Sequence, residues 1–281
     1  MSEPVFPKVT ADDGLVPDDW SCWVVADVHG VSGGLVRALA KAGVADGSGR
    51  WAAPRKTALV LLGDMVGRGP DTLGVLRLVD GLSAGARAAG GRVVYVRGNH
   101  EQALLDVVGG DGDALERWLA KGGRAALISL GVIAAQDRRP TIAAVERFLR
   151  ERHPWLGPRL RATYPYALWR GVAMVHAGLP KGGPGALPGG RGATLDDGAF
   201  LRSGGAGTGE YSGYAGLRGV VVGHIPHIRP ALYHGGRTLA IDTNAASQPG
   251  DVVSAAVTLV KLPEQGPLSS AREVSARVGG A

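Results

Sequence analysis

The feature that most constrains the fold of this chain is a set of short apolar runs. Each run ends at a turn that carries a polar side chain able to bind a metal ion. The runs and their turns are Trp23–Ala26 before Asp27-Val28-His29-Gly30, Ala58–Leu62 before Gly63-Asp64, Val93–Val96 before Arg97-Gly98-Asn99-His100-Glu101, Val172–Val175 before His176-Ala177-Gly178, and Val220–Val222 before Gly223-His224. Continuous apolar runs of this length are typical of strands that are buried on both faces.

Helical patterns separate the first three runs. Apolar side chains recur there at helical spacing, first Leu35, Leu39 and Ala42, and then Leu73, Leu76, Val79 and Leu82. This alternation of strand and helix predicts an α/β fold whose sheet is covered on both sides. In such sheets ligands bind beyond the carboxyl ends of the strands, which is where all the polar turns fall. We therefore expect the turns to form one site.

The rest of the chain divides by composition around one expected domain. This domain is expected at residues 21–262, after an irregular, Pro-containing lead-in at residues 1–20. Amphipathic stretches at about residues 102–170 predict a helical cap over the site. A Gly-rich stretch at about 182–216 predicts a long lid loop, and the Pro/Ser/Gly-rich residues 263–281 predict a flexible tail.

Composition and charge limit the classes of function. With 45% hydrophobic and 20% charged residues, the 281-residue chain is expected to be globular rather than disordered. It has no run near the roughly 20 apolar residues of a membrane helix, no secretory signal pattern, and one cysteine, Cys22. We therefore expect a cytoplasmic protein with no membrane partner. The net charge of +6 suits an anionic substrate, whereas the lack of a Lys/Arg-rich run argues against nucleic acid.

The polar turns supply side chains of the kinds that bind metals. They are Asp27, His29, Asp64, Asn99, His176 and His224. Carboxylates, an amide and imidazoles without a thiolate suit manganese, iron or zinc, and suit calcium or magnesium poorly. The set exceeds the needs of one tetrahedral zinc and suffices for two metals that share a carboxylate, for which Asp64 is the natural bridge. Taken singly, each residue could instead cap a helix or pack in the core, so the hypothesis depends on their joint position.

With these motifs, the chain resembles the calcineurin-like metallophosphoesterases, and within them the bacterial branch of the phosphoprotein phosphatase (PPP) group. It also has some resemblance to symmetrical dinucleoside tetraphosphatases. The matching segments, within about residues 22–245, are Asp27-Val28-His29-Gly30, Gly63-Asp64-Met65-Val66-Gly67-Arg68-Gly69-Pro70, Arg97-Gly98-Asn99-His100-Glu101, His176-Ala177-Gly178 and Gly223-His224. The resemblance implies an α/β metallophosphatase sandwich, in which two central β-sheets are flanked by helices.

The resemblance also implies a role for each matching residue. The implied metal ligands are Asp27 and His29 at the first ion, Asp64 between both ions, and Asn99, His176 and His224 at the second. The two divalent ions are expected to be manganese, with iron or zinc as alternatives, and a hydroxide that bridges them would attack phosphorus. Arg68 and Arg202 would bind the phosphate oxygens, and His100 would protonate the leaving oxygen.

The chain departs from the PPP pattern at Gly67. PPP protein phosphatases usually carry an aspartate there, and its carboxylate pairs with the catalytic histidine, which corresponds to His100. The sequence leaves open whether Glu101 or a cap residue replaces this carboxylate. Dinucleoside polyphosphate hydrolases look similar at this position, and their nucleotide leaving group needs less acid assistance than a serine alkoxide. In contrast, the cap segment Trp118–Gly123 is more similar to the bacterial protein-phosphatase-like branch.

The expected function is therefore metal-dependent hydrolysis of phosphomonoesters, and a nucleotide or small phosphorylated metabolite is the favoured substrate. A phosphoserine/phosphothreonine protein is the alternative, and a dinucleoside polyphosphate is the second alternative. A relative that binds phosphorylated partners without hydrolysing them is disfavoured, because the complete ligand set is present together with His100 and Arg68.

Two weaker signals lie beside these motifs. Ser32 fits a Gly-x-Ser-x-Gly pattern, but it lies too far past the strand for a nucleophile elbow and is expected to cap a helix that starts near Gly34. His227, three residues after His224, is a candidate for an additional metal ligand.

Overall fold

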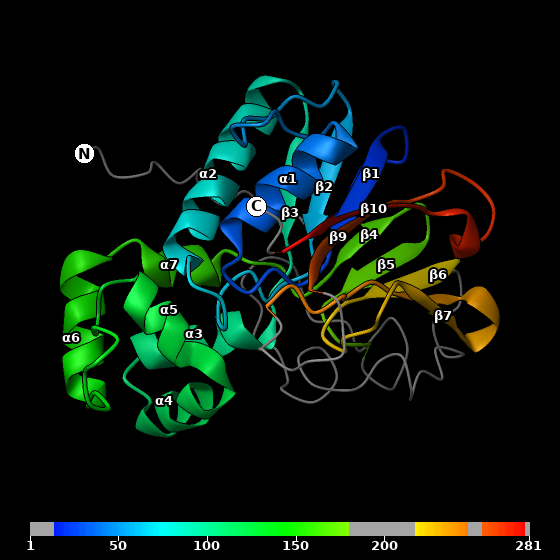
Figure 1. Cartoon of the computed structure of the whole chain (residues 1–281). Helices are drawn as coiled ribbons and strands as arrows, with labels where there is room; N and C mark the ends of the chain where they lie inside the picture. Colours follow the sequence, from blue (N-terminus) through cyan, green and yellow to red (C-terminus); the bar gives the residue numbers. More distant parts are fainter. Residues whose placement is uncertain (1–13, 180–216, 247–254, 279–281) are drawn as a thin grey trace.

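The computed structural model describes residues 14–179, 217–246 and 255–278. Two five-stranded sheets pack against each other, and helices cover the outer face of the first (Figure 1). The order of the first sheet is β10-β9-β1-β2-β3, and that of the second is β4-β5-β6-β8-β7. The strands are β1 (Ser21–Val25), β2 (Thr57–Leu61), β3 (Arg92–Tyr95), β4 (Ala167–Trp169), β5 (Val172–Val175), β6 (Gly219–Val222), β7 (Ala231–Tyr233), β8 (Thr238–Ala240), β9 (Ala256–Lys261) and β10 (Arg272–Arg277). The predicted metallophosphatase sandwich is confirmed.

The apolar runs are buried on both faces, as their composition predicts. In β1, Cys22 and Val24 pack into the layer between the sheets, where Cys22 Sγ lies 3.8 Å from Met174 Sδ. Trp23 and Val25 point the other way, into the layer beneath the helices. Since successive side chains of a strand alternate between its faces, both faces of the run have to be apolar.

Parallel pairing brings the ends of the central strands together. β1, β2 and β3 are parallel in the first sheet, and β5, β6 and β8 are parallel in the second. Helices α1 (Ser32–Ala42) and α2 (Thr72–Ala88) connect the first three strands and cover the outer face of their sheet. The two predicted helical patterns thus form helices.

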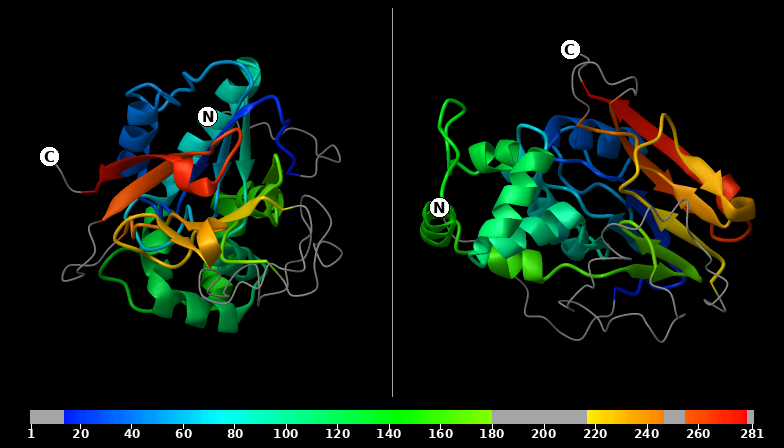
Figure 2. Two further views of the ribbon diagram at one scale, coloured as in Figure 1. Left: turned by 90° about the vertical axis from the view of Figure 1, so that its right-hand side faces the viewer. Right: turned by 90° about the horizontal axis from the view of Figure 1, so that it is seen from below.

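The helical cap lies beside one end of the sandwich (Figure 2). It consists of α3 (Asn99–Val108), α4 (Gly112–Trp118), a π-helical segment (Leu119–Gly123), α5 (Arg124–Ser129), α6 (Ile142–Arg152) and α7 (Leu156–Arg161). The sequence range of 102–170 is shifted, because the first cap helix begins at Asn99 and residues 167–169 form β4 of the second sheet. No helix within the described part of the chain has both the length and the apolarity that crossing a membrane requires.

The prediction of a flexible tail at residues 263–281 is wrong at residues 272–277, which form β10. β10 pairs with β9 over its whole length, and Val274 is buried against the helix-side core. The Ser and Gly content concealed a strand whose burial comes mainly from one side chain. The expected lid loop at 182–216 and Arg202 lie outside the described residues, as do residues 1–13 of the lead-in, whereas Leu15 pairs with Leu168 of β4.

Candidate metal centre and active site

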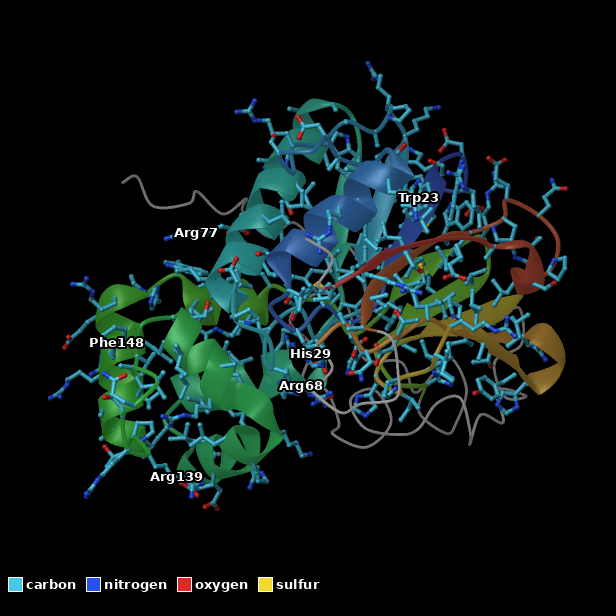
Figure 3. All side chains as sticks on the ribbon, viewed as in Figure 1. Trp23, His29, Arg68, Arg77, Arg139 and Phe148 are labelled. Atoms are coloured by element: carbon cyan, nitrogen blue, oxygen red, sulfur yellow. The ribbon has the colours of Figure 1, made fainter. Side chains whose placement is uncertain are left out.

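The polar turns meet at the carboxyl ends of the parallel strands, beside the cap. Figure 3 shows His29 and Arg68 next to each other in this region. His29, Asp64 and His224 all have a positive φ, of 50°, 50° and 66°. A non-glycine residue adopts this conformation only when its surroundings hold it there, and at these positions it turns the chain sharply as it leaves the strand.

Asp64 lies at the centre of the site. It belongs to two groups of potential metal ligands, one with His29 and His100 and the other with His176 and His224. In each group the ligand atoms lie within 4.8 Å of one another. Asp64 Oδ1 accepts a hydrogen bond of 2.8 Å from the backbone N–H of His100, which leaves Oδ2 3.7 Å from His29 Nε2 and 3.6 Å from His176 Nε2.

Two backbone carbonyls fix the proton positions of the histidines on either side of Asp64. His29 Nδ1 lies 3.1 Å from the carbonyl oxygen of Val66, and His176 Nδ1 lies 2.9 Å from that of Leu62. A carbonyl only accepts, so each Nδ1 carries the proton and each Nε2 carries a lone pair. Burial lowers the pKa of His29 to about 3 and that of His176 to about 4, which keeps both rings neutral.

The second group gathers electron-rich atoms. His176 Nε2 lies 3.0 Å from Asn99 Oδ1 and 3.1 Å from His224 Nδ1, in addition to its approach to Asp64. The lone pairs of His176 Nε2 and Asn99 Oδ1 repel each other at this distance unless a cation lies between them. The nitrogen and oxygen donors therefore fit the divalent cations that the sequence predicts.

Asp27 lies next to these two ligand groups but belongs to neither of them. Its buried carboxylate accepts hydrogen bonds of 3.1 and 3.2 Å from the backbone N–H of His224. Burial raises its pKa well above the usual value, and the nearby carboxylates of Asp242 and Asp64 raise it further. Three acidic groups crowded in a buried region favour binding of a cation, which would offset their repulsion.

Sequence analysis missed Asp242. It follows β8, which pairs in parallel with β6, and so its carboxylate reaches the same edge of the sheet as His224. Burial raises the pKa of Asp242 to about 6. The signal was present in the sequence, since residues 238–241 are a short apolar run before an aspartate, but one threonine and the short length made it weaker than the other runs.

Glu101 shapes the turn that carries Asp64. Its Oε2 accepts from the backbone N–H groups of Asp64 at 2.7 Å and Gly98 at 2.9 Å. Its Oε1 accepts from the Met65 and Val66 N–H groups and from the Tyr95 hydroxyl. With both oxygens engaged there, Glu101 does not replace the carboxylate that is missing at residue 67.

His100 instead contacts a tryptophan of the cap. The Trp118 indole Nε1 donates a hydrogen bond of 3.1 Å to His100 Nδ1. A Cβ atom on Gly67 would collide with this Nδ1 and lie 3.0 Å from His29 Nδ1, and Gly67 has a φ of 129°. Among the described residues, His100 Nε2 has no hydrogen-bond partner, although it is buried. Burial lowers the pKa of His100 well below its usual value, and His29 and Arg68 lower it further.

Cationic side chains border the site. Arg68 is exposed, and its charge lowers the pKa of Asp64, which burial raises to about 7. Lys121 of the cap acts on Asp64 in the same direction, a contribution that the sequence did not predict. The ring nitrogens of His227 lie 2.6 Å from the Ile225 carbonyl and 2.7 Å from the Tyr233 hydroxyl, and His227 belongs to neither ligand group.

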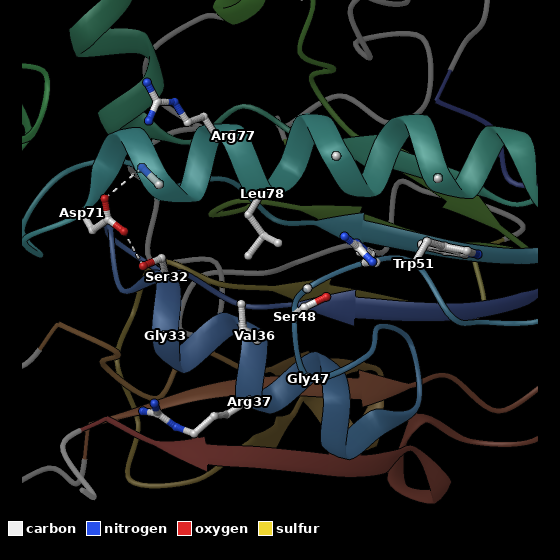
Figure 4. Close-up of a pocket in the computed structure, with 15 residues that line it drawn as sticks. Ser32, Gly33, Val36, Arg37, Gly47, Ser48, Trp51, Asp71, Arg77 and Leu78 are labelled. Carbon is white, nitrogen blue, oxygen red and sulfur yellow. Dashed lines mark hydrogen bonds between the residues drawn. The ribbon is translucent and has the colours of Figure 1, made fainter.

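A pocket of about 930 Å³ lies away from these residues, between α1, the loop at residues 46–51 and α2 (Figure 4). Within it the Ser32 hydroxyl donates to the Asp71 carboxylate, which also accepts from Gly74 N at 2.9 Å and caps α2. Ser32 is the first residue of α1 rather than its cap, so the sequence expectation is wrong here.

This arrangement agrees with the comparison with known protein families. The family model of calcineurin-like phosphoesterases matches residues 21–227. The chain belongs to this family. It is therefore a hydrolase of phosphate esters from a family that uses divalent metal ions, and its two ligand groups are candidates to hold them.

Similar proteins differ in the substrate that they are named for. This phosphoesterase is 28% identical over 252 residues to an asymmetrical bis(5'-nucleosyl)-tetraphosphatase, PrpE, of Halalkalibacterium halodurans, a match covering 86% of this chain and 89% of that one. It is 35% identical over 101 residues to serine/threonine-protein phosphatase 1 of Salmonella typhimurium, a match that covers 36% of this chain and 38% of that one. A solved cold-active protein tyrosine phosphatase superposes with a TM-score of 0.62 at 18% identity, over 95% of this chain and 83% of that one, which shows the shared fold.

Proposed function

We propose that this phosphoesterase hydrolyses phosphate bonds of nucleotides or other small phosphorylated metabolites with two divalent cations. The observation that carries the proposal is the position of Asp64, which belongs to both groups of potential ligands. An ionised carboxylate has two oxygens and four lone-pair sites, so it can bind two cations at once. A site for two cations is suited to displacement at phosphorus, where charge has to be neutralised on both sides.

The proposed ligands combine the family resemblance with the two groups of potential ligands in the structure. Asp27, His29 and Asp64 would hold the first cation, and Asn99, His176 and His224 would hold the second together with Asp64. Manganese is the proposed ion, with iron or zinc as alternatives, because the donors are oxygen and imidazole nitrogen. When bound, such ions make water nucleophilic near neutral pH and neutralise the charge of the phosphate.

The remaining residues would bind and orient the substrate. Arg68, which is exposed beside His29, is placed to bind phosphate oxygens through its forked N–H groups. We propose Arg202 as a second phosphate-binding arginine on the basis of the sequence. His100 lies next to Asp64 and His29, and its Nε2, which has no hydrogen-bond partner in the described part of the chain, would interact with the leaving oxygen.

The environment of His100 favours a substrate with a good leaving group. The chain has no side chain at residue 67, and His100 Nδ1 contacts an indole N–H in place of a carboxylate. A nucleotide phosphate departs with little acid assistance, whereas a serine alkoxide requires much more. Dinucleoside polyphosphates are the first nucleotides to test, because the relative that matches most of the chain is named for them.

A phosphoserine/phosphothreonine protein is the second candidate substrate. The observation in its favour is the match to the Salmonella protein phosphatase, which has higher identity but spans little more than a third of the chain.

A panel of substrates with added manganese tests the proposal. Dinucleoside tetraphosphates, nucleoside monophosphates, sugar phosphates and phosphopeptides would be compared by kcat/KM. We expect a nucleotide to be the best substrate, and a preference for phosphopeptides over all small molecules would overturn this assignment. Asp64→Asn is the matched control: it should abolish turnover and weaken manganese binding, while far-UV circular dichroism shows the fold unchanged.

A further inference from the structure

The indole of Trp118 contacts His100 at the base of the site. The two side chains are 2% and 1% exposed, and the indole Nε1 lies 3.1 Å from His100 Nδ1. An indole N–H can only donate, so His100 Nδ1 accepts and the ring proton lies on Nε2. That Nε2 is the atom with no partner among the described residues.

We propose that Trp118 is a positioning residue that holds His100 as a hydrogen-bond donor, rather than a proton donor, to the leaving group. The enzyme would then select substrates whose leaving group departs as a stable anion, which are phosphoanhydrides such as dinucleoside polyphosphates. This inference rests on the proposed function, and it names the substrate class for the same site.

The neighbouring His29 shows what Trp118 changes. The rings of His29 and His100 lie 4.7 Å apart and belong to the same potential ligand group. His29 donates from Nδ1 to the Val66 carbonyl, so its Nε2 offers a lone pair, which a metal can bind. His100 has the opposite tautomer, and a protonated nitrogen cannot bind a metal. Because of Trp118, His100 is a hydrogen-bond donor at Nε2, whereas the neighbouring His29 keeps an Nε2 lone pair that a metal ion can accept.

Glycines in two segments make this contact possible. A Cβ atom on Gly67 would occupy the space beside His100 Nδ1. A Cβ atom on Gly123 would collide with the Trp118 indole, so this glycine lets the π-helical segment pack closely against the ring. The cap motif Trp118–Gly123 thus holds the indole against His100 Nδ1, the same atom that a Cβ on Gly67 would meet.

The single ring proton of His100 explains why a good leaving group would be selected. In hydrolysis, water supplies the oxygen that bonds to phosphorus and loses its proton to solvent. The bond from phosphorus to the leaving oxygen breaks, and the electron pair stays on that oxygen. If His100 transferred its Nε2 proton while Nδ1 accepted from Trp118, it would become an imidazolate, which is too basic to form near neutral pH. A hydrogen bond from the neutral ring can still stabilise a departing phosphate anion, as neutral imidazoles do in other active sites.

Nitrogen NMR of the histidine side chains tests the tautomer in the metal-free protein. We expect His100 to show an unprotonated, hydrogen-bonded Nδ1 and a protonated Nε2 in the wild type. Trp118→Phe should abolish this fixed state. A protonated Nδ1 in the wild type, or unchanged His100 signals in the variant, would overturn the inference.

Trp169→Phe is the matched control for loss of a buried indole. Trp169 is 1% exposed and lies in the core layer between the two sheets, where its N–H donates to the Trp20 carbonyl at 3.1 Å. It should lose stability without changing the His100 signals. If Trp118→Phe does not fold, benzothienylalanine at residue 118, which keeps the ring shape but has no N–H, decides between packing and hydrogen bonding.

Leaving-group dependence tests the consequence for catalysis. For the manganese-loaded wild type, kcat/KM should fall steeply from a dinucleoside tetraphosphate through an aryl phosphate to an alkyl phosphate. Trp118→Phe frees His100 Nδ1, so the ratio of alkyl phosphate to anhydride turnover should rise by about tenfold, which is a part of the roughly 100- to 10,000-fold that full general acid catalysis supplies. Trp169→Phe should leave this ratio unchanged, and an equal loss on all substrates in Trp118→Phe would contradict the inference. The NMR experiment needs neither metal nor substrate, so it tests the tautomer of His100 even if the proposed function is wrong.

Discussion

At the scale of single residues, the site depends on which nitrogen of each histidine carries the proton. Backbone carbonyls fix His29 and His176 with their Nε2 lone pairs facing Asp64, whereas an indole fixes His100 the other way round. The residue types alone do not distinguish these states, because a neutral imidazole can place its proton on either nitrogen. Small changes beside a ring nitrogen should therefore have large effects on activity.

Gly67→Ala tests this dependence. The new Cβ would overlap His100 Nδ1, and the φ of 129° is unfavourable for alanine, so the ring has to move away from Trp118. We expect kcat/KM to fall by about a hundredfold and the protein to lose about 1–3 kcal/mol of stability, as measured by urea unfolding.

Gly81→Ala is the control for this substitution. Gly81 lies within α2, and a Cβ there would contact nothing within 4 Å. It should keep full activity and gain up to about 1 kcal/mol of stability from helix propensity. Full activity of Gly67→Ala would show that the position of His100 tolerates displacement.

At the scale of elements, the turn after β2 is held by the first turn of α3. Glu101 bonds four backbone N–H groups, those of Asp64, Met65, Val66 and Gly98, so the helix that carries Asn99 and His100 also positions Asp64. The Gly-Asn-His-Glu motif therefore joins two candidate site residues and one structural residue in one unit.

Glu101→Gln should disrupt this unit. A glutamine side chain would turn an N–H₂ group toward backbone donors, which leaves buried N–H groups without acceptors. We expect a loss of at least about 2 kcal/mol in urea unfolding, with weaker manganese binding. Glu146→Gln, which removes one surface pair with Arg150, should cost less than about 1 kcal/mol. Equal effects of the two variants would contradict the role of Glu101.

The edge strand β10 contributes to the core through Val274. This side chain packs into the helix-side core, whereas Glu273 beside it is exposed. Val274→Asp should cost about 2–4 kcal/mol because it buries a charge against apolar neighbours, and Glu273→Ala should change stability by less than about 0.5 kcal/mol. Thermal unfolding of both variants measures this, and a flexible tail would show no difference between them.

At the scale of the whole molecule, two sheets deliver buried acidic groups to one place. Asp64, from the first sheet, and Asp242, after β8 of the second, have pKa values that burial raises to about 7 and about 6. Folding without metal thus costs free energy above these pKa values, and binding of cations would recover it.

Manganese binding should therefore weaken as the pH falls. The pKa of Asp64 is about 7 in the folded protein, so its carboxylate takes up a proton as the pH falls through 7. This proton competes with the metal ion for the same oxygens. His29 and His176, with pKa values of about 3 and 4, stay neutral and do not compete. Protonation of Asp64 alone should raise the apparent Kd for manganese roughly tenfold when the pH is lowered from 8 to 6. Calorimetric titration of the metal-free protein measures this, and a pH-independent Kd would contradict a ligand role for Asp64.

The sequence by itself determined strands β1, β2, β3, β5 and β6, the helices α1 and α2 between the first three of them, and the polar turns at the strand ends. These features are local: a run apolar on both faces must be buried, and parallel strands place their carboxyl ends together. The sequence missed β10 because its burial comes mainly from Val274, and it missed Asp242 because its run is short. Only the tertiary structure decided which nitrogen of each histidine is protonated and that Trp118, 18 residues from His100, stands where a carboxylate was expected. Those outcomes depend on contacts across the fold, and neither composition nor spacing encodes the direction of a hydrogen bond.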